Sequence, residues 1–120
     1  MSTSAIDRAV FARLGEITGD DPEFLAELVD TYLADGEAQV RALREAPPGD
    51  LAALVRPAHS LKSSSASIGA LALADRCRTL EGAARAGQVE DVDGAIEAIA
   101  EGFASAATEL AAIRSGGATR

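Results

Sequence analysis

Residues 50–70 read DLAALVRPAHSLKSSSASIGA, and their apolar positions decide the fold that we expect. Side chains three and four residues apart share one side of an α-helix. The apolar or small residues at that spacing are Leu51, Leu54, Val55, Ala58, Leu61, Ser65 and Ile68. Asp50 can cap the start and Gly69 breaks the pattern, so the spacing predicts a helix here. Pro57 lies inside it and predicts a kink, because proline removes one backbone hydrogen bond.

The same spacing recurs on both sides of this stretch. Before it, we expect a short helix over about 6–14 and a long one that Asp21-Pro22-Glu23 begins and Pro47 ends. After it, we expect a helix from about Leu71 to Gly87 and a last one over about 89–113. The chain therefore contains four long amphipathic helices and one short leading helix.

Short connections make consecutive helices antiparallel neighbours. The predicted fold is all-α: an antiparallel up-down-up-down four-helix bundle with a short additional N-terminal helix. Its 120 residues suffice for a single domain, 1–120, whose helical bundle covers about 6–113. Residues 115–120 have no large apolar side chain, and we expect a frayed tail there.

Composition excludes several classes of function. The net charge of −8 argues against nucleic acid and against an anionic membrane surface as partners. One cysteine, Cys77, and one histidine cannot build an ordinary zinc site, so we expect a buried free thiol. No apolar run is long enough to span a membrane and residues 1–4 do not resemble a signal peptide, which favours a soluble, cytoplasmic protein.

His59, the only histidine, shares a helix side with Lys62 and Ser63. It lies ten residues before Gly69, where the two middle helices fold into a hairpin. Residues ten to twelve after Gly69 lie at the same height, so Glu81 is within reach of the imidazole. Arg78 is close by, and Arg85 stands about one turn further on.

This arrangement suits phosphoryl chemistry. An imidazole is mostly uncharged at neutral pH and has one nitrogen with a free lone pair. If Glu81 accepts the Nδ1–H proton, the tautomer is set and Nε2 is the nucleophile. Lys62, with Arg85 or Arg78, would offset the negative charge of a phosphohistidine.

These residues resemble the histidine-containing phosphotransfer (HPt) domains of multistep two-component phosphorelays. The resemblance is carried by the run from His59 through Leu61-Lys62 and the small residues to Gly69, and it covers about 6–113. It implies that His59 is the phosphorylated residue, that Lys62 attends the phosphoryl group and that Glu81 orients the ring. It gives supporting positions to Arg85 and, less consistently, to Arg78.

One residue departs from the family pattern. Ser63 stands where many members have a glycine, which leaves room for the active site of the partner. Serine is still small and its hydroxyl group could donate a hydrogen bond to phosphate, so we interpret it as a tolerated variant.

The resemblance also implies partners and cofactors. His59 would accept a phosphoryl group from the aspartyl phosphate of a receiver domain and pass it to another receiver domain. The partners would be response-regulator receiver domains and a hybrid histidine kinase, and a monomer would suffice. The chain would be a phosphocarrier and no enzyme, with no autonomous kinase activity. It would need no cofactor, because the Mg²⁺ belongs to the receiver.

Other interpretations stay open. A lone histidine on a helix is usually a solvated side chain, and charged residues on helices commonly form local pairs. The chain could be a helical adaptor or inhibitor that binds a receiver or histidine kinase without carrying phosphate. It could also be the phosphoacceptor domain of a larger chemotaxis-type kinase.

Overall fold

The computed structural model describes residues 4–117, and all regular structure in that range is helical. The helices are α1 (Arg8–Ile17), α2 (Pro22–Glu45), α3 (Ala52–Ile68), α4 (Leu71–Arg85) and α5 (Val92–Gly117). The all-α class and the sequence of one short and four long helices match the prediction. No helix within residues 4–117 combines the length and hydrophobicity needed to cross a membrane.

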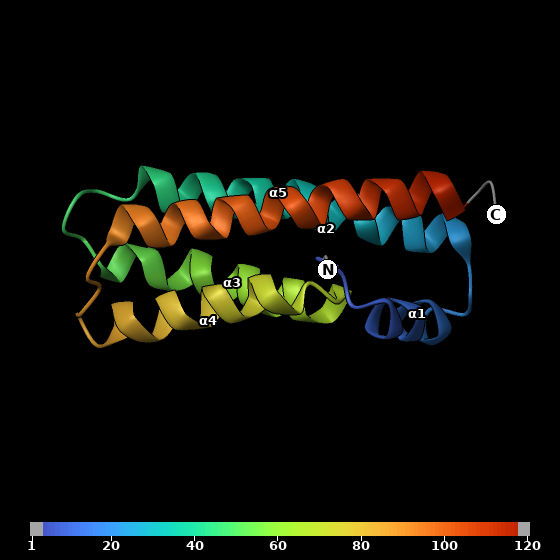
Figure 1. Ribbon diagram of the computed structural model, residues 1–120, viewed down its shortest axis with the longest axis horizontal. Coiled ribbons are helices and arrows are strands. Elements are labelled where there is room, and N and C mark those ends of the chain that lie inside the picture. The colour runs from blue at the N-terminus through green and yellow to red at the C-terminus, as the bar shows by residue number, and fades with distance from the viewer. Residues whose placement is uncertain (1–3, 118–120) are drawn as a thin grey trace.

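The long helices lie in two layers. In Figure 1, α2 and α5 form one layer, and α3 and α4 form the other. The first pair extends beyond the second, and α1 lies under the extension, next to the turn that joins α3 and α4. Most of α3 and α4 therefore has one side against the other layer and one side open to solvent.

Local chemistry explains where the helices begin. The Asp21 carboxylate accepts hydrogen bonds from the N–H groups of Glu23 and Phe24, and Pro22 occupies the first helical position. Asp7 caps α1 in the same way. The Asp50 carboxylate accepts from the N–H of Ala53, although α3 is one residue shorter at its start than predicted.

The helices α1 and α5 also differ from the prediction, and α1 continues to Ile17 instead of ending near residue 14. α1 begins at Arg8, because Ile6 belongs to the preceding segment, where it is fully buried. α5 begins at Val92 and continues to Gly117, so residues 115–117 are helical where we expected the tail. Residues 118–120, the rest of that tail, lie outside the described part of the chain.

The core consists mainly of the predicted side chains, with two corrections. Phe24 and Leu71, which the spacing placed inward, are 44 % and 43 % exposed because they lie in first helical turns at the ends of the layers. Cys77 is buried as expected, and burial raises the pKa of its thiol to about 12. α3 continues unbroken through Pro57, which is itself buried.

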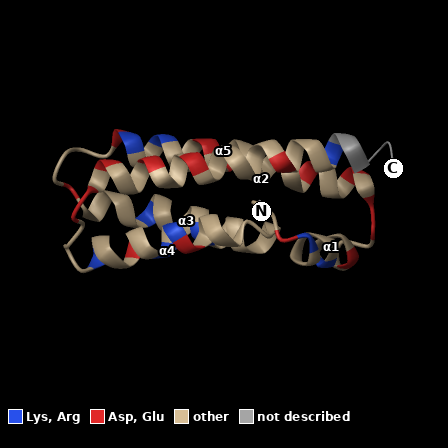
Figure 2. Ribbon diagram, viewed as in Figure 1, with Lys and Arg blue, Asp and Glu red and all other residues tan. Residues whose placement is uncertain are grey.

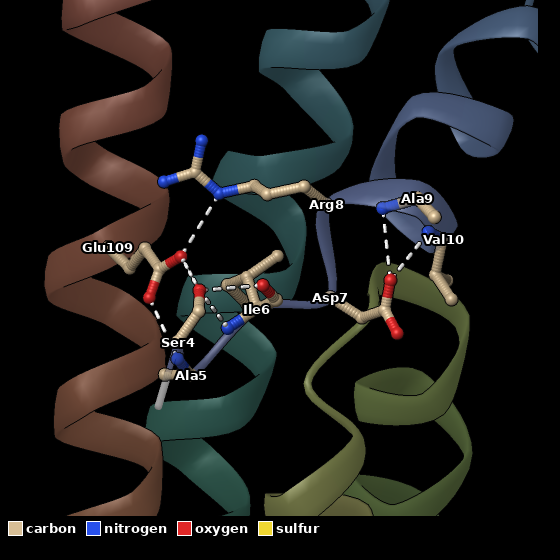
Figure 3. A network of polar contacts seen from close by, with 8 residues as sticks. All are labelled: Ser4, Ala5, Ile6, Asp7, Arg8, Ala9, Val10 and Glu109. Carbon is tan, nitrogen blue, oxygen red and sulfur yellow. Dashed lines mark hydrogen bonds and ion pairs between the residues drawn. The ribbon is translucent and has the colours of Figure 1, made fainter. Parts of the chain in front are cut away.

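The segment before α1 ties two distant elements together (Figure 3). The Glu109 carboxylate of α5 accepts hydrogen bonds from the Ser4 hydroxyl, the Ala5 N–H at 2.8 Å and Arg8 Nε at 3.1 Å. On its other side, the Asp7 N–H donates to the Gly69 carbonyl at 2.7 Å, in the turn between α3 and α4. The N-terminal segment thus connects α5 with the α3–α4 hairpin.

Candidate functional site

His59 lies on the solvent side of α3. Its neighbours Ala58 and Leu61 are fully buried and occupy the opposite side of the helix. The imidazole side chain is 53 % exposed, which makes it accessible to another molecule. The helical spacing predicted this placement, because Ala58 and Leu61 are inward positions of the helix and residue 59 is not one of them.

Glu81 of α4 contacts the imidazole ring at Nδ1. Its Oε2 lies 2.9 Å from Nδ1 of His59, and Glu81 is buried, with only 6 % of the residue exposed. A carboxylate accepts hydrogen bonds and cannot donate them when ionised, so Nδ1 carries the proton. Nε2 then has the free lone pair and is the nucleophilic nitrogen of the ring.

Two cations neutralise this buried carboxylate. Lys62 Nζ lies 2.7 Å from Oε1 as an ion contact without regular hydrogen-bond angles. Arg85 Nε and Nη2 donate to Oε2 at 3.1 and 2.9 Å. The Lys62 contact, helped by Arg85 and His59 and opposed by burial, lowers the pKa of Glu81 to about 2. Glu81 is therefore ionised at neutral pH.

The exposed side chains that follow His59 on α3 are small. Ser63, one turn after His59, is exposed, and so are Ala66 and Ser67 further along. The hydroxyl of Ser67 donates to the carbonyl oxygen of Ser63, within the helix. A partner surface can therefore approach His59 closely along α3.

Of the five predicted site residues with ionisable side chains, the structure brings four together and leaves one out. His59, Lys62, Glu81 and Arg85 form one connected cluster. Arg78 instead pairs with Asp75 of its own helix, and within residues 4–117 it forms no ion pair with the cluster. The local i,i+3 pair explains this difference, because its partner lies on the same helix side.

One contact of the site was not predicted. The sequence pattern assigned Lys62 only to a phosphoryl group, whereas its ammonium group is paired with Glu81. The signal was available, because position 62 lies one turn from His59 and therefore near the same height as Glu81 in the hairpin. Within residues 4–117, no three His, Cys, Asp or Glu side chains are grouped closely enough to hold a metal ion.

Comparisons with known proteins agree with this geometry. The Hpt domain family profile matches residues 27–115. The crystal structure of histidine-containing phosphotransfer protein B (HptB) from Pseudomonas aeruginosa PAO1 is similar, with a TM-score of 0.85 and 34 % sequence identity. That similarity covers 95 % of this chain and 97 % of the other. No curated protein matches the chain significantly.

Proposed function

This chain belongs to the Hpt domain family and has a histidine phosphotransfer role in phosphorelays, and on that premise we propose that His59 carries the phosphoryl group. The observation that supports this assignment is the 2.9 Å contact between His59 Nδ1 and Glu81 Oε2. It orients an exposed imidazole with Nε2 as the nucleophile. His59 is the only histidine in the sequence.

In the transfer step, one bond to phosphorus forms and another breaks. Nε2 attacks the phosphorus of an aspartyl phosphate on a receiver domain. The Nε2–P bond forms while the P–O bond to the aspartyl carboxylate breaks, and the carboxylate leaves with the electron pair. Reversal on a second receiver domain passes the phosphoryl group on and returns a neutral imidazole.

Glu81 and Lys62 have complementary roles in this step. The ring keeps its Nδ1 proton, so it gains positive charge as the Nε2–P bond forms, and the Glu81 carboxylate stabilises that charge. Lys62, one helical turn away, offsets the negative charge of the phosphoryl oxygens. Arg85 is a positioning residue, because it binds the same carboxylate oxygen as His59 does.

The finer features of the family form part of the same proposal. The contacts of α2 with α3, α3 with α4, and α5 with both α4 and α2 support an up-down-up-down bundle of the long helices. We propose a cytoplasmic, monomeric phosphocarrier without kinase activity of its own. Its partners are receiver domains and a hybrid histidine kinase, and the Mg²⁺ of the reaction is held by the receiver.

Phosphotransfer profiling tests the assignment. Wild-type protein is incubated with a panel of purified receiver domains that carry radiolabelled aspartyl phosphate. We expect acid-labile, alkali-stable label on the wild type and none on His59→Gln. Equal labelling of the variant would refute the role of His59, and a tight complex without label would favour a non-phosphorylated adaptor.

A further inference from the structure

Four serines follow His59 on α3, within residues 63–67, and three of their hydroxyl groups already have partners in the protein. These three are Ser64 and Ser67, which donate to backbone carbonyl oxygens of α3, and buried Ser65, which shares a hydrogen bond of 2.7 Å with the Tyr32 hydroxyl. The fourth serine, Ser63, is exposed, and its hydroxyl forms no hydrogen bond with any residue in 4–117. Ser63 therefore has a donor that the fold does not use.

This hydroxyl lies beside the reactive histidine. Ser63 is one helical turn after His59 on the same side of α3, and the Cβ atoms of such pairs are about 5–6 Å apart. Side chains of an α-helix point towards its N-terminus, so the Ser63 hydroxyl leans towards the turn that contains His59. It therefore borders the exposed surface at which a phosphoryl group on Nε2 would lie.

The neighbouring donors of the site are already engaged with Glu81. Lys62 Nζ lies 2.7 Å from Oε1, and Arg85 Nε and Nη2 donate to Oε2. After Lys62, residues 63–68 of α3 contain no charged side chain (Figure 2). The Ser63 hydroxyl is thus the group that this part of α3 can offer to a phosphoryl oxygen without breaking a contact of the unmodified protein.

We propose that the Ser63 hydroxyl binds the phosphoryl group on His59 and stabilises the phosphorylated protein. The inference rests on the proposed function and assigns a further residue to its site. The O–H donates to a non-bridging phosphoryl oxygen, and no covalent bond changes at Ser63. Because Ser63 is exposed and gives up a hydrogen bond to water, the net effect is small, about two- to five-fold in an equilibrium constant. Serine adds a ligand here, where glycine would leave only space.

A titration of the phosphorylated full chain tests the contact without any partner. Potassium phosphoramidate, a small phosphoryl donor, phosphorylates His59, and ³¹P NMR follows the second ionisation of the phosphoryl group. A donated hydrogen bond favours the dianion, so Ser63 lowers the pKa of this group. We expect Ser63→Ala and Ser63→Gly to lower its second acid dissociation constant about two- to three-fold, and Ser63→Thr, which keeps the hydroxyl, to retain the wild-type value.

The second measurement is the equilibrium of phosphoryl exchange with a receiver domain from the panel. Ser63→Ala and Ser63→Gly should lower the ratio of phosphohistidine to aspartyl phosphate about two- to five-fold, and Ser63→Thr should not. Ser67→Ala is the matched control. Ser67 is an exposed serine of the same helix, but it lies two turns from His59 and its hydroxyl donates to the Ser63 carbonyl oxygen. We expect wild-type values for this variant in both measurements.

The outcomes separate the two proposals. Wild-type values for Ser63→Ala and Ser63→Gly would overturn the role of Ser63 and leave the phosphotransfer role intact. Equal changes in Ser67→Ala would also overturn it, and so would a lower exchange ratio with an unchanged titration, because the hydroxyl would then not contact the phosphoryl group. If phosphoramidate phosphorylates His59 and no receiver domain does, the proposed function fails, while the titration still decides the role of Ser63. If neither donor phosphorylates His59, both proposals fail.

Discussion

Lys62 Nζ lies 2.7 Å from Glu81 Oε1, so the lysine is already paired while His59 is unmodified. The same carboxylate accepts the Nδ1–H of His59 through its other oxygen. A phosphoryl group on Nε2 would compete with Glu81 for the ammonium group. Once the phosphoryl group draws Lys62 away, Glu81 keeps more of its negative charge. The hydrogen bond from Nδ1–H of the positively charged ring to Glu81 then becomes stronger.

This arrangement predicts the effect of removing the lysine charge. Lys62→Ala should slow phosphoryl transfer to His59 about 10- to 100-fold, since a hydrogen bond between charged groups contributes about 1.5–3 kcal/mol. Lys62→Arg keeps the charge and should retain most of the rate. Single-turnover transfer from a phosphorylated receiver domain measures both. A Lys62→Ala protein as fast as the wild type would contradict the role.

The depressed pKa of Glu81 predicts how stability depends on pH. Its value falls from an ordinary 4.5 to about 2, chiefly through Lys62, so the unfolded chain binds more protons between these two values. This group therefore adds stability as pH rises from about 2 to 4.5, and its contribution is complete above that range. It is lost again as pH falls through the folded pKa.

Glu81→Gln removes this contribution and provides the test. The difference in free energy of unfolding between wild type and variant should grow from pH 2 to pH 4.5 and then stay constant, as followed by urea denaturation. Glu109, whose pKa is lowered chiefly by the Ser4 hydroxyl, should leave a residual slope in the variant. If the free energies of unfolding of the two proteins differed by the same amount at every pH from 2 to 4.5, Glu81 would not be stabilised as an anion.

Helix packing predicts opposite effects at two glycines. A Cβ atom at Gly36 of α2 would lie 2.6 Å from Cζ of Phe103 in α5, whereas one at Gly82 of α4 would meet nothing within 4 Å. Gly36→Ala should destabilise the protein by about 1–2 kcal/mol, because overpacking exceeds the gain in helix propensity. Gly82→Ala should stabilise it by about 0.5–1 kcal/mol. Urea denaturation compares them, and equal shifts would contradict the close packing at Phe103.

The sequence was sufficient for features governed by local chemistry or regular spacing. Asp21-Pro22 marked the start of α2, and the register of the hairpin at Gly69 placed Glu81 opposite His59, in agreement with the 2.9 Å contact. The end of α5 was not predictable, because residues 115–117 have no apolar side chain to continue the pattern. Arg78 forms the local i,i+3 pair that is ordinary for charged helix residues, and spacing alone could not decide between its two acidic neighbours, Asp75 and Glu81.

The N-terminal segment, in contrast, depends on contacts between residues far apart in the sequence. The pattern placed Ile6 inside the first helix, but its side chain is buried in the segment before α1. That segment is held by Glu109 and Gly69, and neither position has a periodic signal that points to the N-terminus. Such pairings become visible only when the chain is folded.

Gly69 provides a test of this attachment, with Gly87 as its control. Both have positive φ angles, 98° and 73°, which an alanine adopts at a cost of about 1–2 kcal/mol. A Cβ atom at Gly69 would also lie 2.9 Å from the Asp7 carbonyl oxygen, whereas one at Gly87 would meet nothing within 4 Å. Gly69→Ala must therefore displace the N-terminal segment, and Gly87→Ala need not.

We expect Gly87→Ala to lower the free energy of unfolding by about 1 kcal/mol and Gly69→Ala by about 1–3 kcal/mol more. Urea denaturation measures the difference. Amide hydrogen exchange locates it, because the Asp7 N–H donates to the Gly69 carbonyl and the Ala5 N–H to Glu109. Both amides should exchange faster in Gly69→Ala than in the wild type, and their exchange rates should be unchanged in Gly87→Ala. Equal destabilisation with equal exchange would mean that the segment is not held at this turn.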